Sequence, residues 1–121
     1  MSTENGIGLS LFFVDTDGPV FGTEQDALDL LGQTYGKEID VIVVPANRFS
    51  PDFYDLSSRL AGHFFQKMQD YRMRLVILGD ISVPMAASKA LRDFVSETNR
   101  MGYHLFVAER TELEDKLRRN D

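Results

Sequence analysis

The 121-residue chain contains no cysteine and no tryptophan, and only two histidines. Without cysteine it can form no disulfide, no thiolate zinc site and no iron–sulfur cluster. His63 and His104 are separated too widely in the sequence to form a local metal-binding motif. We therefore expect no metal ion and no other cofactor.

Positive charge and long apolar runs are also scarce. Thirteen Lys and Arg residues against nineteen Asp and Glu residues give a net charge of −6, which opposes binding to phosphate backbones and to anionic membranes. No apolar run approaches the ~20 residues that cross a bilayer, and the N-terminus lacks the basic and apolar regions of a signal peptide. These absences predict a cytoplasmic protein without nucleic-acid or membrane partners. Its length fits one domain, over residues 1–121.

Several short segments have the composition of β-strands. Residues 9–15 and Val20–Phe21 flank the turn signal Thr16-Asp17-Gly18, which predicts an antiparallel hairpin. Pro19 places its second strand at an edge of the sheet. The remaining strand segments are residues 39–44, 75–78 and 103–107. The first is apolar except for Asp40, and the second is continuously apolar. Such runs are typical of parallel strands that are covered on both faces.

Helical spacing of apolar residues predicts the helices between these strands. Thr23 and Gly36 bound the first, Ser50 and Tyr71 the second, and Ser88 and Gly102 the third, while a capping box at Thr111 begins a fourth. The second stretch could be one long helix, or a helix broken by a new N-cap at Asp55. The order predicts an α/β fold with a mostly parallel sheet of about five strands, an antiparallel N-terminal edge and about four helices.

The second helical stretch carries a wide apolar stripe. Its members are Phe53, Leu56, Leu60, Ala61, Phe64, Phe65, Met68 and Tyr71. Because one side of a helix suffices to cover a sheet, the rest of the stripe could contact a second copy of the chain or another protein. A neighbouring helix of the same domain could cover it instead. We expect a homodimer or a protein partner.

Polar residues at the carboxyl ends of the parallel strands are candidates for ligand binding. Asp80 follows a buried strand, and it could accept a proton, hold a cation or cap the following loop. Ser88, Arg92, Ser96 and Asn99 share one flank of the third helix, where Arg92 could grip an anion or pair with a neighbouring acid. No nucleophile–base pair and no glycine-rich phosphate loop is visible, so we predict no catalytic residues.

Ser57 and Ser58 follow Asp55 near the start of the second helix. A phosphate on either hydroxyl would benefit from the positive end of the helix. On a continuous helix, however, Ser57 would be a small packing residue in the apolar stripe. Both readings stay open at this point.

Several short sequence segments, in their order and spacing, resemble those of a bacterial family known as domain of unknown function 4180. They are residues 26–32, residues 49–56, Leu60-Ala61-Gly62 with Gln66-Lys67, Tyr71-Arg72, Gly79-Asp80, and residues 88–94 with Glu97-Thr98-Asn99-Arg100. The resemblance assigns no activity. It implies that the polar positions of these segments are site candidates: Asp55, Gln66, Tyr71, Arg72, Asp80, Ser88, Arg92, Glu97 and Asn99.

The element order also resembles the STAS fold of anti-sigma factor antagonists. Those regulators bind a kinase-like protein and are switched by phosphorylation of a Ser or Thr at the second helix. Asp55-Leu56-Ser57-Ser58 is similar to their Asp-Ser-Ser/Thr-Gly switch, with Leu56 interposed and Arg59 in place of the glycine. The leading hypothesis is a non-enzymatic regulatory or protein-interaction module. The alternative is a small-molecule-binding or catalytic domain with a polar site around Asp80 and Arg92.

Overall fold

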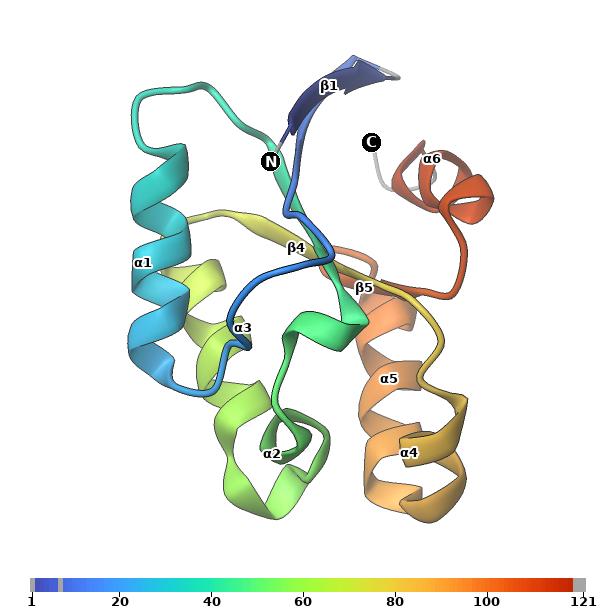
Figure 1. Ribbon diagram of the computed structural model, residues 1–121. Coiled ribbons are helices and arrows are strands. Elements are labelled where there is room, and N and C mark those ends of the chain that lie inside the picture. The colour runs from blue at the N-terminus through green and yellow to red at the C-terminus, as the bar shows by residue number, and fades with distance from the viewer. Residues whose placement is uncertain (1, 7, 119–121) are drawn as a thin grey trace.

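The computed structural model describes residues 2–6 and 8–118, and over these residues it shows one sheet of five strands. The strands follow the order β1-β2-β3-β4-β5 across the sheet (Figure 1). Strand β1 is antiparallel to β2, and the other three pairs are parallel. Their bounds are Ser2–Gly6, Leu9–Phe13, Val41–Pro45, Arg74–Leu78 and Leu105–Val107. The expected α/β class, with a mostly parallel sheet and an antiparallel edge, is confirmed.

Six α-helices lie in the described residues, where the sequence predicted about four. Three longer helices connect the parallel strands: α1 (Glu24–Thr34), α3 (Leu60–Asp70) and α5 (Lys89–Met101). Helix α6 (Arg110–Arg118) follows β5 and begins one residue before Thr111, the predicted cap. The additional helices are the short α2 (Pro51–Tyr54) and α4 (Ser82–Ala87). None of the helices described has the length and apolar character required to cross a membrane.

The second helical stretch is broken, which resolves the alternative left open by its sequence. After α2, the 3₁₀ turn η2 (Leu56–Ser58) begins at Asp55, and Arg59 takes a left-handed conformation with φ of 66°. A right-handed helix cannot continue through such a residue. Helix α3 therefore starts afresh at Leu60 and runs in a new direction.

The predicted hairpin is wrong in one strand. The antiparallel partner of β2 is the N-terminal β1, with Thr3 opposite Phe12. Val20 and Phe21 lie outside the sheet, where Phe21 forms an isolated parallel bridge with Phe49. Phe21 packs against the core, with its ring 5.8 Å from that of Phe49, whereas Val20 is exposed.

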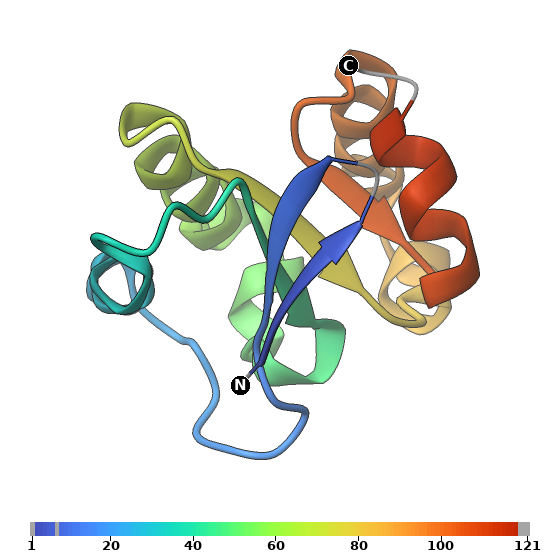
Figure 2. The same cartoon turned by 90° about the horizontal axis from the view of Figure 1, so that it is seen from above.

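Each face of the sheet has its own helical cover. Because the strands follow chain order, right-handed connections place α1, α3 and α5 on the same face. Their apolar side chains pack on alternate strand residues such as Ile42 and Leu75. On the opposite face lies α6 (Figure 2). Its Leu113 and Leu117 belong to one buried cluster with Val41, Val43 and the other alternate strand residues. The two central strands are thus buried on both faces, as their continuous apolar runs predicted.

Most of the wide apolar stripe is covered by the chain itself, whereas Tyr71 at its end is exposed. Phe53, Phe64 and Met68 are 0–1% exposed, and Phe65 is 7% exposed. The Phe64 ring contacts the rings of Phe49 and Phe53, at centroid distances of 5.2 and 5.9 Å. This aromatic cluster fills the space between α2, α3 and the sheet. The surplus that led us to expect a partner on this helix is internal packing.

Candidate functional site

The carboxyl ends of β3 and β4 approach each other closely. Gly79, directly after β4, has φ of +147°, and a Cβ atom placed there would lie 2.9 Å from the Cβ of Ala46. Only glycine avoids this contact and adopts such a φ without strain. The Gly79 N–H also donates to the Val107 carbonyl at 2.9 Å, which ties the turn to β5. Asp80 is thereby held at a defined position on the rim of the sheet.

Asp80 is exposed, and its carboxylate caps the start of α4. Its Oδ1 accepts a hydrogen bond from the Ser82 backbone N–H at 2.8 Å. Hydrogen bonds from the Ser82 hydroxyl and then from that N–H hold the pKa of Asp80 below its usual range. The capping role expected as one alternative is therefore present. It leaves an ionised carboxylate on the rim.

Two depressions meet at Asp80. The first, which we call the α5–α6 cavity, has a volume of about 300 Å³ and lies between the start of α4, α5, the end of β5 and α6. Its polar lining residues are Asp80, Ser82, Asn99, Glu112 and Lys116, and its apolar ones include Met85, Val95 and Phe106. Both acidic and basic side chains thus line one cavity.

The second depression, the α2–α4 groove, has a volume of about 400 Å³. Apart from Asp80, its lining residues are uncharged: Ala46, Asn47, Phe49, Pro51, Tyr54, Ile81 and Pro84. The Tyr54 hydroxyl donates to the Ala46 carbonyl at 2.7 Å, and burial raises the pKa of Tyr54 well above its usual range. The groove is an apolar surface with one carboxylate at its edge.

Arg92 and Ser88 form hydrogen bonds at the ends of two helices. The Arg92 Nη1 donates to the carbonyls of Met85 and Ala86 at 2.7 and 3.3 Å, at the last turn of α4. The Ser88 Oγ accepts from the Leu91 N–H at 3.1 Å and so caps α5. Neither residue lines the α5–α6 cavity or the groove.

Asn99 lines the α5–α6 cavity and stabilises its β-strand wall. Its Nδ2 donates to the Phe106 carbonyl at 3.1 Å, and its Oδ1 accepts from the Phe106 N–H at 2.8 Å. The side-chain amide thus pairs with the outer edge of β5 as another strand would. Of the residues predicted from the sequence, Asp80 and Asn99 are brought together here.

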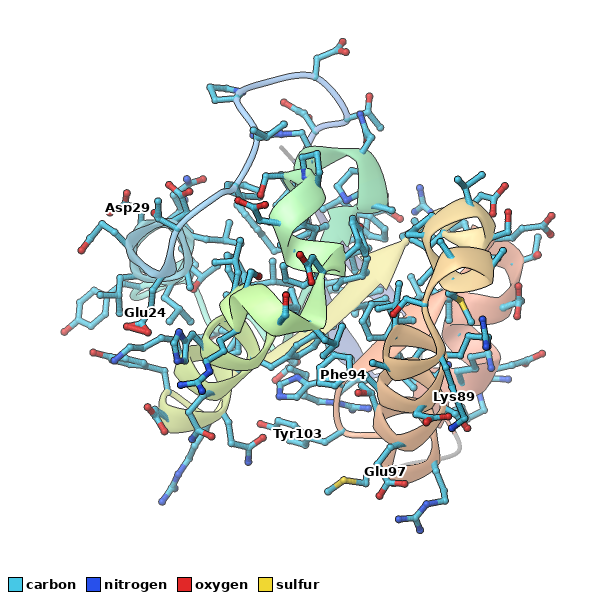
Figure 3. The ribbon with its side chains drawn as sticks, turned by 90° about the horizontal axis from the view of Figure 1, so that it is seen from below. Glu24, Asp29, Lys89, Phe94, Glu97 and Tyr103 are labelled. Atoms are coloured by element: carbon cyan, nitrogen blue, oxygen red, sulfur yellow. The ribbon has the colours of Figure 1, made fainter. Side chains whose placement is uncertain are left out.

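Glu97 points outward from α5, as does Lys89, whereas Phe94 lies between α5 and α3 (Figure 3). Glu97 forms a two-pronged ion pair with Arg100, with N–O distances of 3.1 and 2.5 Å. The hydrogen bonds from Arg100 hold the pKa of Glu97 below its usual range. This pair lies on the exposed surface, apart from both depressions.

Asp55, Ser57 and Ser58 form the exposed turn between α2 and α3. The Asp55 Oδ1 accepts from the Ser57 hydroxyl at 2.6 Å and from the Ser57 N–H at 3.0 Å, and these bonds lower the pKa of Asp55. The Ser58 hydroxyl donates to the Asp52 carbonyl at 2.6 Å and accepts from the Leu60 N–H at 3.2 Å. Because α3 begins only at Leu60, Ser57 lies outside the apolar stripe.

The other polar residues of the segments that resemble the family, Gln66, Tyr71 and Arg72, also lie on the surface. Gln66 donates to Asp70 one turn further along α3, at 2.8 Å. Tyr71, at the end of that helix, is 63% exposed, and Arg72 takes a left-handed conformation in the turn that follows. None of the three lines a depression described above.

Comparison with known protein families assigns the chain to one of them. Residues 8–117 match a family described as a domain of unknown function, DUF4180. The chain belongs to the DUF4180 family. Neither the curated proteins nor the solved structures contain a significant match to it. The expected family is thus confirmed, and it carries no assigned activity.

Sequence reasoning missed Arg48 of this DUF4180 chain. Arg48 is 6% exposed, and its guanidinium donates to the carbonyls of Asp15, Asp17 and Pro19. A Cβ at Gly18 would lie 2.8 Å from that guanidinium, so the loop closes around it only with glycine there. Only the position of Arg48 after a buried strand was visible in the sequence, and that position gave no sign of burial.

Glu112 and Lys116 of the α5–α6 cavity were also missed. They come from α6, which crosses to the other face of the sheet, and no spacing in the sequence links them to Asp80. Within residues 2–6 and 8–118, no group of three or more His, Asp or Glu side chains is arranged to hold a metal ion. The arrangement instead supplies charged and apolar groups for non-covalent binding.

Proposed function

We propose that this DUF4180 protein is a non-enzymatic regulatory module that binds a segment of another protein in the α2–α4 groove. The observation that carries the proposal is the exposure of α4. This helix has the sequence SVPMAA and buries none of its residues, and Val83 is 81% exposed. Ala86 and Ala87, one turn later, are exposed as well. An apolar helix beside an apolar groove is typical of a docking surface.

Charge indicates the chemistry of the partner. Asp80 lines the groove as an ionised carboxylate, and the exposed Asp52 lies on α2, next to the lining residue Pro51. The chain as a whole carries a net charge of −6. We therefore infer a partner segment that combines apolar side chains with Lys or Arg, because such a segment complements both the groove and its acidic rim.

Site-specific crosslinking tests the proposal. A photoreactive amino acid at Val83 should crosslink one protein in cells that express the chain, through a peptide that contains apolar and basic residues. Binding of that peptide should weaken with salt and be lost in Val83→Glu. The same photoreactive group at Met101, which is 68% exposed on α5, is the control. Equal labelling from both positions, or an acidic peptide at Val83, would refute the proposal.

A second copy of the chain is the occupant that the sequence led us to expect. Most of the stripe that motivated a homodimer is buried within the chain, and two acidic grooves facing each other would repel. Light scattering on purified protein separates the cases. If the protein is a dimer and Val83→Glu dissociates it, the occupant of the groove is a second copy of the chain and not another protein.

The regulatory part of the proposal is supported by the order of elements, which resembles that of the STAS fold. We also propose a cytoplasmic location, as the sequence led us to expect. Phosphorylation at Ser57 is a weaker part of this hypothesis. Its hydroxyl is exposed, but a phosphate there would lie beside the Asp55 carboxylate, and like charges repel. Mass spectrometry of the protein isolated from its native cells tests this modification.

A second candidate function is small-molecule binding in the α5–α6 cavity. The supporting observation is that Asp80, Glu112 and Lys116 line it together with apolar side chains, a combination typical of small-molecule sites. Thermal-shift screening with small charged metabolites tests it, since a ligand that binds the folded state raises the melting temperature. Asp80→Asn should abolish a shift that arises at this site.

A further inference from the structure

We infer that the α5–α6 cavity binds a free amino acid with an apolar side chain, an inference that rests on the second function proposed above. The ligand class follows from three features of the cavity: its two kinds of charge, its apolar wall and its size.

The charged wall fits a ligand that carries both an ammonium and a carboxylate group. Asp80 and Glu112 contribute two carboxylates from different parts of the chain, the first from the turn after β4 and the second from the first turn of α6. Lys116 lines the same cavity, four residues after Glu112, and therefore on the same side of α6. Lys116 already interacts within the chain, so a ligand carboxylate would share its three N–H donors.

The apolar wall fits an aliphatic or small aromatic side chain. Val95 and Phe106 are 7% and 5% exposed, and Met85 completes this wall with an unbranched, adaptable side chain. Asn99 holds Phe106 through both backbone groups, so the wall is fixed before a ligand arrives. This rigidity lowers the entropy cost of binding.

Size and charge exclude other ligand classes. A volume of about 300 Å³ is at the lower end of the range for small-molecule sites, which excludes dinucleotides and large cofactors. Two carboxylates against one ammonium oppose phosphates and simple carboxylic acids. A simple amine would pair with the carboxylates but would bring no anionic group to Lys116.

Three ligands with the same apolar body test the inference by isothermal titration calorimetry. They are leucine, 3-methylbutylamine, which lacks the carboxylate, and 4-methylpentanoate, which lacks the ammonium. We expect leucine to bind at least about tenfold more tightly than either analogue, because each analogue loses one charged hydrogen-bonding group. If the amine binds as tightly as leucine, the inference is refuted while the small-molecule function stands. If none of the three binds, the inference is refuted, and the small-molecule function falls as well only if the thermal-shift screen also finds no ligand.

Two substitutions separate the roles of the charges. Asp80→Asn should weaken both leucine and the amine by about tenfold or more, and Lys116→Gln should weaken leucine alone. Asp93→Asn is the matched control, because Asp93 is exposed on α5 and pairs with Lys89 at 2.7 Å. Val83→Glu, which should abolish partner binding in the α2–α4 groove, should leave leucine binding unchanged. Equal losses in Asp93→Asn and Asp80→Asn would overturn the assignment to this cavity.

Discussion

Replacing Arg48 by methionine is the most direct test of how the chain holds the rim of its sheet. The Arg48 Nε donates to the Pro19 carbonyl at 3.0 Å, and its Nη1 donates to the carbonyls of Asp15 and Asp17 at 2.6 and 3.1 Å. The guanidinium also lies 4.8 Å from the centre of the Phe21 ring. One buried side chain thus joins the end of β3 to the loop that follows β2.

The size of the effect follows from these contacts. A hydrogen bond from a charged donor contributes about 1.5–3 kcal/mol, so three bonds would contribute roughly 4.5–9 kcal/mol if nothing offset them. Two effects do offset them. The loop is exposed, so its carbonyls can bond water after the substitution, and methionine removes the cost of burying a charge, which is several kcal/mol. We expect Arg48→Met to lower the free energy of unfolding by about 2–3 kcal/mol.

Urea denaturation measures this loss, and amide hydrogen exchange over residues 15–20 locates it. Arg48→Lys should lie between the wild type and Arg48→Met, because an ammonium keeps the charge but cannot reproduce the planar fork. Arg100→Met, which removes an exposed ion pair, is the control and should change stability by less than about 0.5 kcal/mol. The reasoning is refuted if Arg48→Met behaves like this control and the loop exchanges as in the wild type.

Three further predictions concern other parts of the structure. Phe64→Ala should cost about 3–5 kcal/mol in urea denaturation, because the ring is fully buried among aromatic neighbours; a loss below about 1 kcal/mol would contradict that packing. Gly79→Ala should lower the free energy of unfolding by at least about 2 kcal/mol, because Gly79 has φ of +147° and a Cβ there would contact Ala46. Gly62→Ala, in open space within α3, is the control and should raise the free energy of unfolding by up to about 1 kcal/mol. Equal effects of the two substitutions would contradict the strain assigned to Gly79. His104 adds a pH dependence, since burial, with a smaller effect of Arg74, lowers its pKa from 6.5 to about 4. Between these values the unfolded state binds the proton more readily, so stability should fall as pH falls from about 6.5 to about 4, and the slope between pH 7 and 5 should flatten in His104→Gln.

The central strands were predictable because burial on both faces demands continuous β-branched and aliphatic residues. Val41–Val44 and Leu75–Ile77 meet that demand, and all are at most 1% exposed. Strand β1 was not predictable from composition. Its sequence STENG is polar, in keeping with the exposure of Thr3, Glu4 and Asn5. The apolar Val20–Phe21 imitated a strand because Phe21 packs in the core.

The break between α2 and α3 was hidden for a similar reason. Both helices pack on the same core, through Phe53 on α2 and through Phe64 and Met68 on α3. Apolar residues therefore recur across the turn as they would along one helix. The left-handed conformation of Arg59 ends that continuity, and its residue type carries no signal for it.

Part of the candidate site was visible and part was not. Asp80 could be identified because a residue after a buried parallel strand lies on the rim. The role of Arg92 could not be identified, because it donates to carbonyls of α4, and the sequence predicted no helix between residue 78 and Ser88. The place of Glu112 and Lys116 in the cavity depends on which face of the sheet α6 covers. Tertiary packing alone decides that face.

The position of the α5–α6 cavity follows from the edge of the sheet. Strand β5 is the last strand and pairs with β4 alone, and its final residue Val107 lies opposite Leu78 at the end of β4. Since α5 and α6 cover opposite faces, the two helical layers are no longer separated by backbone beyond this edge strand. Asn99 satisfies the outer edge of β5 at Phe106, which keeps the edge of this short strand from pairing with another chain. The space between the two layers can therefore stay hollow and lined by charged residues without destabilising the strand beside it.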